Sequence, residues 1–247
     1  MRPLDKYKVD TPVILDDGTE VVVSEIYDPY GNARPILLNN FGDYCSYCEN
    51  SLHNGTLFDT EHIRPKDSNP DLKTKWSNFL IGCRACNGPS GKWKNDIKVP
   101  TMHLPHLNNT FLSLIYDEAG GVSVNTSLSK ESQKNAQALI DFVHLDKSPK
   151  KSLEDKDGRC KMRRMTWKMA KDMLNLYENN RCETTLKMLL KLIEQRGGWS
   201  IWFTVFKNHD EVRKAMIDFH GTAKDCFDAN NHYEPIPRNP LNEIDPI

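Results

Sequence analysis

The pattern of apolar and polar residues predicts hairpins in the first half of the chain and helices in the second. Residues 12–27 and 111–125 alternate around turns that contain glycine, which predicts two β-hairpins. Residues 129–143, 161–178 and 183–195 place apolar side chains three to four positions apart, which predicts helices. The chain is therefore expected to combine small sheets with a mostly α-helical C-terminal half.

The ends of the predicted helices carry local signals. Ser129 suits an N-cap, and the glycines at 197–198 suit the end of a helix. Residues 199–206, WSIWFTVF, are apolar at nearly every position, which favours buried core over a partner surface. A short helix at 210–219 precedes a Pro- and Asn-rich tail, 234–247, that we expect to be extended.

Residues 44–97 contain no long periodic element but are rich in Cys, Gly, Asn and Pro. This composition is typical of a subdomain that a metal ion stabilises in place of a larger core. We therefore predict an α+β fold with four segments. These are N-terminal strands and a lead-in at 1–43, a metal-stapled core at 44–100, a hairpin and helix at 101–146, and a helical region with an extended tail at 147–247.

Four of the seven cysteines form two Cys-x-x-Cys pairs, Cys45 with Cys48 and Cys83 with Cys86. Two such turns bring four sulfurs around one tetrahedral zinc ion. All four positions are then filled by thiolates, so the zinc would be structural. A single pair also suits a redox motif, but two pairs favour zinc. The 34 residues between the pairs form an unusually long loop.

Composition narrows the class of protein. The chain has 247 residues, a formal net charge of −1, 38% hydrophobic residues and a mean hydropathy of −0.63. No apolar run approaches the roughly 20 residues that span a bilayer, so we expect a cytoplasmic protein without disulfides. Residues 147–171 carry ten Lys or Arg against three acids, a pattern typical of a solvated helix face. The other cysteines, Cys160, Cys182 and Cys226, are expected to be buried thiols.

The loop between the cysteine pairs contains FDTEHIRPKD at 58–67, followed by KWSNFLIGCRACN at 75–87. His62, Asn78 and Asn87 follow one another at intervals of 16 and nine residues. This order resembles the HNH, or ββα-metal, nucleases over about residues 44–94. The resemblance is strongest to the branch in which zinc-binding Cys-x-x-Cys pairs bracket the motif.

The resemblance implies a role for each motif residue. His62 would be the general base that takes a proton from the attacking water. Glu61 and Asn87 would hold one catalytic Mg²⁺ or Mn²⁺ ion, which oxygen ligands suit better than zinc. Asn78 would hold the loop and orient His62. The cations expected to steady flanking phosphates are Arg64, Lys66 and Lys92.

Neighbours on a strand face opposite ways, so Glu61 and His62 can serve one phosphate only if the strand ends, bends or bulges there. His103 and His106 are further candidates for the lining of the site, although such a pair is more often only part of a loop.

The order of FGDYCSYCEN, EHIRPK and WSNFLIGCRACN before a helical half is similar to the HNH proteins of Septu-type anti-phage systems and some retron operons, the PtuB-like group. The resemblance implies the nuclease subunit of a defence complex. Its partners would be nucleic acid, with DNA favoured over RNA, and a controlling ATPase of the SMC or ABC-like kind. The alternatives are a stand-alone restriction- or homing-type HNH nuclease and a zinc-stabilised nucleic-acid-binding adaptor without catalysis.

Overall fold

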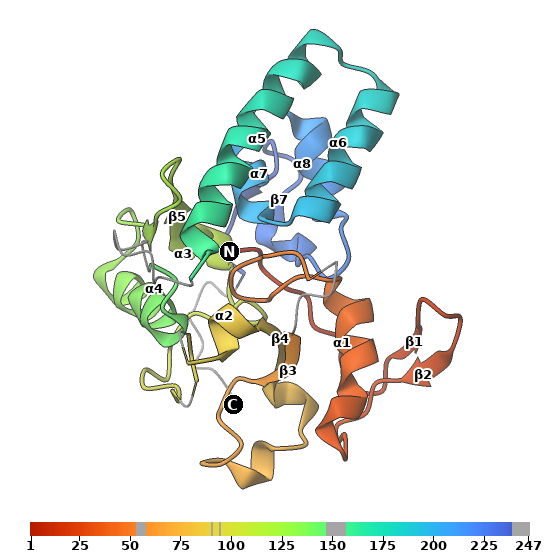
Figure 1. Ribbon diagram of the computed structural model, residues 1–247, viewed down its shortest axis with the longest axis vertical. Helices are drawn as coiled ribbons and strands as arrows, with labels where there is room; N and C mark the ends of the chain where they lie inside the picture. Colours follow the sequence, from red (N-terminus) through yellow and green to blue (C-terminus); the bar gives the residue numbers. More distant parts are fainter. Residues whose placement is uncertain (53–57, 90, 94, 147–156, 239–247) are drawn as a thin grey trace.

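The structure is a computed structural model that describes residues 1–52, 58–89, 91–93, 95–146 and 157–238. It combines two-stranded antiparallel sheets with a helical C-terminal half (Figure 1). The paired strands are β1 (Pro12–Ile14) with β2 (Glu20–Val22), β3 (Phe58–His62) with β4 (Phe79–Cys83), β5 (Leu114–Tyr116) with β6 (Val122–Val124), and β7 (Phe227–Asp228) with β8 (Glu234–Pro235). The α-helices are α1 (Arg34–Phe41), α2 (Arg84–Asn87), α3 (Thr110–Ser113), α4 (Lys130–Val143), α5 (Arg159–Asn179), α6 (Glu183–Arg196), α7 (Trp199–Val205) and α8 (Asp210–Ile217). Short 3-10 turns are η1 (Tyr30–Ala33), η2 (Pro70–Leu72), η3 (Trp76–Asn78) and η4 (Lys224–Cys226).

Both predicted hairpins are confirmed. In the first, β1 pairs with β2 across a turn in which Gly18 has φ +85°, a left-handed value that glycine adopts without strain. The second, β5 with β6, is shorter than predicted. Its first residues form α3 instead, because the Asn109 side chain caps that turn by accepting a hydrogen bond from the Phe111 amide at 3.1 Å.

The predicted helices are present as α4, α5, α6 and α8. The Ser129 hydroxyl caps α4 by accepting from the Ser132 amide at 3.1 Å, and Gly197 follows the last residue of α6 at φ +72°. Cys182 is exposed, so the expectation of a buried thiol is wrong there; its sulfur serves as the N-cap of α6. Parts of the basic connection and of the tail, 147–156 and 239–247, lie outside the described residues.

The apolar segment 199–206 is core. Trp199, Trp202 and Phe203 on α7 are at most 4% exposed, and α7 packs beside α5 (Figure 1). One hydrophobic core takes in residues of all four predicted segments, so the segments pack as neighbours; their boundaries stay a prediction. Among the described residues, no helix is both long and apolar enough to cross a membrane.

The basic run on α5 differs from a simple solvated face. Arg159 and Arg163 are 1% and 2% exposed. Arg163 donates to the carbonyls of Gly120 and Leu145, at 2.7 and 3.1 Å, so the helix uses it to join the β5–β6 turn to the end of α4. The exposed cations of the run are Lys161, Arg164, Lys168 and Lys171.

Candidate active site and metal centre

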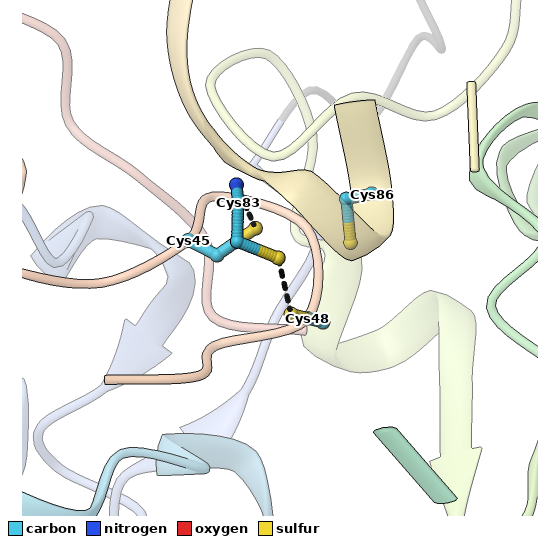
Figure 2. Close-up of side chains that lie close together, drawn as sticks. All are labelled: Cys45, Cys48, Cys83 and Cys86. Carbon is cyan, nitrogen blue, oxygen red and sulfur yellow. Dashed lines mark hydrogen bonds between the residues drawn. The ribbon is translucent and has the colours of Figure 1, made fainter. Parts of the chain in front are cut away.

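The cysteine pairs converge as their spacing predicts. Cys45 and Cys48 lie on the turn after α1, Cys83 ends β4, and Cys86 lies in α2 (Figure 2). All four side chains are buried, and their sulfurs lie within 4.8 Å of one another. Zinc–sulfur bonds of about 2.3 Å in a tetrahedron place the sulfurs roughly 3.8 Å apart. The cluster therefore fits a structural metal ion such as zinc after small side-chain adjustments.

The electrostatics of the cluster also favour a cation. Hydrogen bonds with the neighbouring sulfurs, Cys45 first, raise the pKa of the Cys48 and Cys86 thiols well above the usual range, and bonds of the same kind lower the pKa of Cys83. A divalent cation would replace the protons that these sulfurs share and bind all four as thiolates.

A buried arginine lies against this cluster. The Nη1 atom of Arg159 donates to the Cys86 sulfur at 3.4 Å, while its Nη2 atom pairs with Asp157 at 2.6 Å. The guanidinium also donates to the carbonyls of Val143 and His144, both at 2.9 Å. Four thiolates and one zinc ion carry a net charge of about −2. The guanidinium would offset part of this charge and donates a hydrogen bond to the Cys86 sulfur.

We expect Arg159→Met to weaken zinc binding by roughly 10- to 100-fold, the usual cost of losing a hydrogen-bond partner of a metal ligand. Transfer of zinc to a chromogenic chelator measures this. Arg163→Met is the matched control, because Arg163 is also buried on α5 and bonded to carbonyls but contacts no cysteine sulfur in the described structure. Equal zinc retention by the two variants would contradict the assignment.

A second site opens at β3, as a cavity of about 440 Å³. The strand pairs with β4 in unbroken antiparallel register from Phe58 opposite Cys83 to His62 opposite Phe79. Glu61, His62 and Asn87 all line the cavity, so β3 and α2 place them around one space beside the cysteine cluster. Its remaining lining is Tyr30, Gly31, Arg34, Phe58, Asp59, Thr60, Pro65, Lys66, Asp67, Lys92 and Trp93.

Glu61 is a buried carboxylate with two side-chain partners. It is 1% exposed, its Oε1 atom lies 3.0 Å from the Lys92 ammonium, and it accepts a hydrogen bond from the Tyr47 hydroxyl at 3.3 Å. Burial raises the pKa of Glu61 to about 7, and the opposing effect of Lys92 only partly compensates. The carboxylate is thus poorly stabilised as an anion and favours additional positive charge.

His62 is the last residue of β3. The pairing is regular through both Glu61 and His62 and carries no bulge, so the departure expected between these two residues is not present, and the strand ends only after His62. The Nε2 atom of His62 lies 2.9 Å from the Lys73 carbonyl, and its ring meets the rings of Tyr30 and Phe79 edge to face. A carbonyl only accepts, so Nε2 carries the proton and Nδ1 keeps the basic lone pair.

The charge state of His62 agrees with that tautomer. Burial lowers the pKa of His62 below 6.5, and the nearby lysines act in the same direction. The imidazole is therefore neutral near pH 7 and able to accept a proton at Nδ1.

Asn78 lies outside the cavity and fixes the loop that closes it. It is fully buried, its Oδ1 atom accepts from the Arg64 amide at 2.8 Å, and its Nδ2 atom donates to the carbonyls of Arg64 and Leu72. Leu72 precedes Lys73, whose carbonyl holds His62. Asn78 therefore orients His62 indirectly, through the backbone of the loop.

Sequence reasoning missed Asp59. It lies two residues before Glu61 on β3, lines the same cavity, and its Oδ2 atom accepts from Asn87 Nδ2 at 3.1 Å. This bond leaves the Asn87 Oδ1 atom available to a cation. The signal was in the Asp-Thr-Glu alternation, since residues two apart on a strand share a face.

The three cations expected at flanking phosphates are placed differently from one another. Lys66 lines the cavity, with its ammonium 3.1 Å from the Tyr30 hydroxyl. Arg64 does not line it and contacts Asp96 at 3.5 Å. Lys92 is 2% exposed and bound to Glu61, so its ammonium faces a carboxylate rather than an incoming phosphate. Arg34, a cation that the sequence did not single out, also lines the cavity.

His103 and His106 do not line this cavity. His103 is buried, with Nδ1 2.7 Å from the Ser113 hydroxyl, and burial lowers its pKa to about 4. Burial lowers the pKa of His106 well below the usual value as well. Neither histidine is therefore a lining residue of this cavity, and the alternative, that the pair belongs to a loop, agrees with their position between α2 and α3.

No family model matches the chain. The chain is similar to the Septu protein PtuB of Bacillus thuringiensis, with 37% identity over 73 residues. The match covers 28% of this chain and 28% of the relative, so the chain spans little more than a quarter of the relative's length. The similarity supports a Septu-like relationship.

Proposed function

We propose that the protein is a metal-dependent HNH endonuclease that hydrolyses phosphodiester bonds of nucleic acid. The observation that carries the proposal is the joint placement of Glu61, His62 and Asn87 around one cavity, on a β3–β4–α2 unit. That unit contributes Cys83 and Cys86 to the four-cysteine cluster, at the junction of β4 and α2. A nucleic-acid-binding adaptor needs a stable fold and a basic surface, and nothing in that role requires a neutral imidazole beside an oxygen-rich pocket.

The residues of the cavity fit a hard divalent cation. Asp59, Glu61 and the Asn87 side-chain carbonyl are oxygen donors on one wall, the ligand type that Mg²⁺ and Mn²⁺ prefer. The Lys92 ammonium now supplies the positive charge beside Glu61 that a bound divalent cation would supply. A bound ion would neutralise charge on the phosphoryl oxygens and on the departing oxygen.

The protein's own groups perform the remaining steps. His62 Nδ1 takes a proton from the attacking water, because the Lys73 carbonyl holds the opposite ring nitrogen as the donor. The edge contacts with Tyr30 and Phe79 restrict rotation of the imidazole. Lys66 and Arg34 line the cavity as cations for the flanking phosphates. Asn78 keeps the loop that supplies the Lys73 carbonyl in place.

We further propose that this nuclease acts in anti-phage defence as a cytoplasmic, PtuB-like subunit under the control of an ATPase partner. The similarity to the Septu protein PtuB and the order of the cysteine and EHIRPK motifs support this setting. DNA is the favoured substrate over RNA. The catalytic unit would correspond to residues 44–100, and residues 147–247 would form a separate helical segment.

Asn87 provides the test of the metal site. We expect Asn87→Ala to weaken Mn²⁺ binding by roughly tenfold or more and to slow cleavage of DNA in Mn²⁺, because it removes an oxygen donor. Asn87→Asp is the matched control, since a carboxylate keeps an oxygen in the same position. Electron paramagnetic resonance of Mn²⁺ measures binding, and zinc content confirms an intact fold.

Unchanged Mn²⁺ binding in Asn87→Ala would remove this residue from the metal site. If the wild-type protein bound nucleic acid but neither bound Mn²⁺ nor cleaved DNA or RNA, alone or with its ATPase partner, the adaptor function would replace the nuclease.

A further inference from the structure

Lys92 is a buried cation whose ammonium and backbone amide both have hydrogen-bond partners. Its ammonium lies 3.0 Å from Glu61 Oε1, donates to the His62 carbonyl at 2.5 Å and lies 5.4 Å from the centroid of the Phe142 ring. Both side chains of the ion pair are nearly inaccessible, at 2% and 1%. An ammonium is strongly hydrated in water, so a lysine is buried this completely only where an anion and hydrogen-bond acceptors replace that water.

The backbone of Lys92 is held by the helix that carries Cys86 and Asn87. The Lys92 amide donates to the Cys86 carbonyl at 2.6 Å. At the preceding Gly91, a Cβ atom would lie 2.1 Å from that carbonyl oxygen, so only glycine allows this close approach. The short helix α2 thus carries one cysteine of the cluster and also holds the backbone of Lys92. The part of Lys92 that is free to move is its four-carbon side chain.

Glu61 cannot serve Lys92 and a divalent cation equally. Both positive groups compete for one carboxylate, and a divalent ion on Glu61 would lie within a few ångströms of the ammonium if the side chain stayed where it is. Like charges at that distance repel strongly where water is largely excluded. The two cations are therefore alternative partners of Glu61.

We propose that Lys92 is an internal counter-ion that competes with the divalent cation for Glu61, and that metal binding releases its ammonium from the carboxylate into the cavity. The proposal rests on the nuclease function and adds a regulation of its metal site. Without the metal, Lys92 neutralises the buried carboxylate and keeps β3 and α2 together. With the metal bound, the released ammonium lies in a cavity it already lines, where a substrate phosphate is its natural partner.

Lys66 supplies the matched control. It lines the same cavity, but its ammonium lies 3.1 Å from the Tyr30 hydroxyl and 4.7 Å from the centroid of the Tyr30 ring. Loss of either lysine removes one positive charge from the cavity. Only loss of Lys92 removes the partner of Glu61, so a comparison of the two separates competition for the ligand from a general change in charge.

The test is Mn²⁺ binding to the full-length, zinc-loaded protein, measured by calorimetry or paramagnetic resonance. We expect Lys92→Met to bind Mn²⁺ roughly tenfold more tightly than the wild type, within the range that coupled charged sites reach. Lys66→Met is expected to change the affinity less than about threefold. Glu61→Gln is expected to lose the binding that the wild type shows.

The outcomes separate this proposal from the nuclease function. If the wild type binds Mn²⁺ through Glu61 and Lys92→Met binds it equally or more weakly, Lys92 does not compete with the metal. The proposed nuclease function is then unaffected. If neither the wild type nor Lys92→Met binds Mn²⁺, the cavity is not a metal site. The proposed competition is then refuted as well.

A second measurement uses only the wild-type protein, so it does not depend on whether a variant folds. Acetylation of the wild-type lysines, followed by mass spectrometry, reports how accessible each ammonium is. The proposal predicts that Lys92 is protected without Mn²⁺ and becomes several-fold more reactive at saturating Mn²⁺, while Lys161 on the exposed face of α5 is unchanged. Equal protection of Lys92 with and without bound Mn²⁺ overturns it.

Discussion

Replacing Cys83 by serine is expected to remove zinc from the protein and to abolish most of its folding stability. Cys83 lies at the centre of the cluster, with its sulfur 3.6 Å from that of Cys48 and its amide donating to the Cys45 sulfur at 3.4 Å. Structural zinc sites contribute on the order of 10–16 kcal/mol of apparent binding free energy. A folded domain has a net stability of only about 5–15 kcal/mol, so loss of the ion removes a comparable amount.

Thermal unfolding and zinc analysis measure this effect together. We expect about one zinc ion per wild-type chain and a fall in melting temperature of more than about 10 °C in Cys83→Ser, or no cooperative transition. Cys160→Ser is the control, since that thiol is also buried but contacts the Ala119 carbonyl, away from the cluster. A Cys83→Ser protein that lacked zinc yet melted at the wild-type temperature would refute a structural zinc.

Zinc loss is also expected to reach the helical half of the molecule. Glu49 follows Cys48 in the chain, and its carboxylate accepts from the Ser200 amide at 2.9 Å and from the Ser200 hydroxyl at 2.6 Å. Ser200 lies on α7, which packs in the hydrophobic core with α5. The cysteine turn therefore fixes the position of α7, and the two halves are expected to unfold together.

The parts of the fold that could be predicted are those that local chemistry determines. The helices α4, α5 and α6 are long, periodic and bounded by Ser129 or by glycine, so their limits agree with the prediction to within a few residues. The convergence of the cysteines was predictable because a two-residue gap leaves each pair little freedom around one ion.

Contacts between distant residues could not be predicted in the same way. The sequence predicts Lys92 as a cation for a flanking phosphate, and its burial follows only from the fold that brings it to Glu61. Arg159 and Arg163 likewise belong to a basic run, yet the ends of α4 and the β5–β6 turn cover them with carbonyl acceptors. Charge patterning gives the composition of a helix face, and the tertiary structure decides which charges are solvated.

The candidate site shows the same division. Period-two alternation could have identified Asp59 beside Glu61, because both lie on β3 two residues apart. The hydrogen bond from His62 to the Lys73 carbonyl could not be predicted from the sequence. It depends on how the loop between β3 and β4 returns to the strand. That bond decides which ring nitrogen is basic.

Substitution of His62 is expected to slow phosphodiester cleavage by at least about 100-fold, the lower end of what a positioned general base contributes. His62→Asn is preferable to His62→Ala, because it keeps a polar side chain in the site but has no titratable lone pair. Neither variant changes a cysteine of the cluster or a proposed oxygen ligand. Zinc content and Mn²⁺ affinity are therefore expected to stay at wild-type values. His220→Ala, at an exposed histidine, is the control and is expected to cleave at the wild-type rate.

The most direct test of the proposed nuclease is the rate at which the wild-type and His62→Asn proteins cleave labelled DNA and RNA in Mn²⁺. The two proteins are compared at equal zinc and Mn²⁺ occupancy, each alone and with the proposed ATPase partner. We expect cleavage by the wild type and a loss of at least about 100-fold in His62→Asn. Cleavage by His62→Asn at the wild-type rate would contradict the proposal.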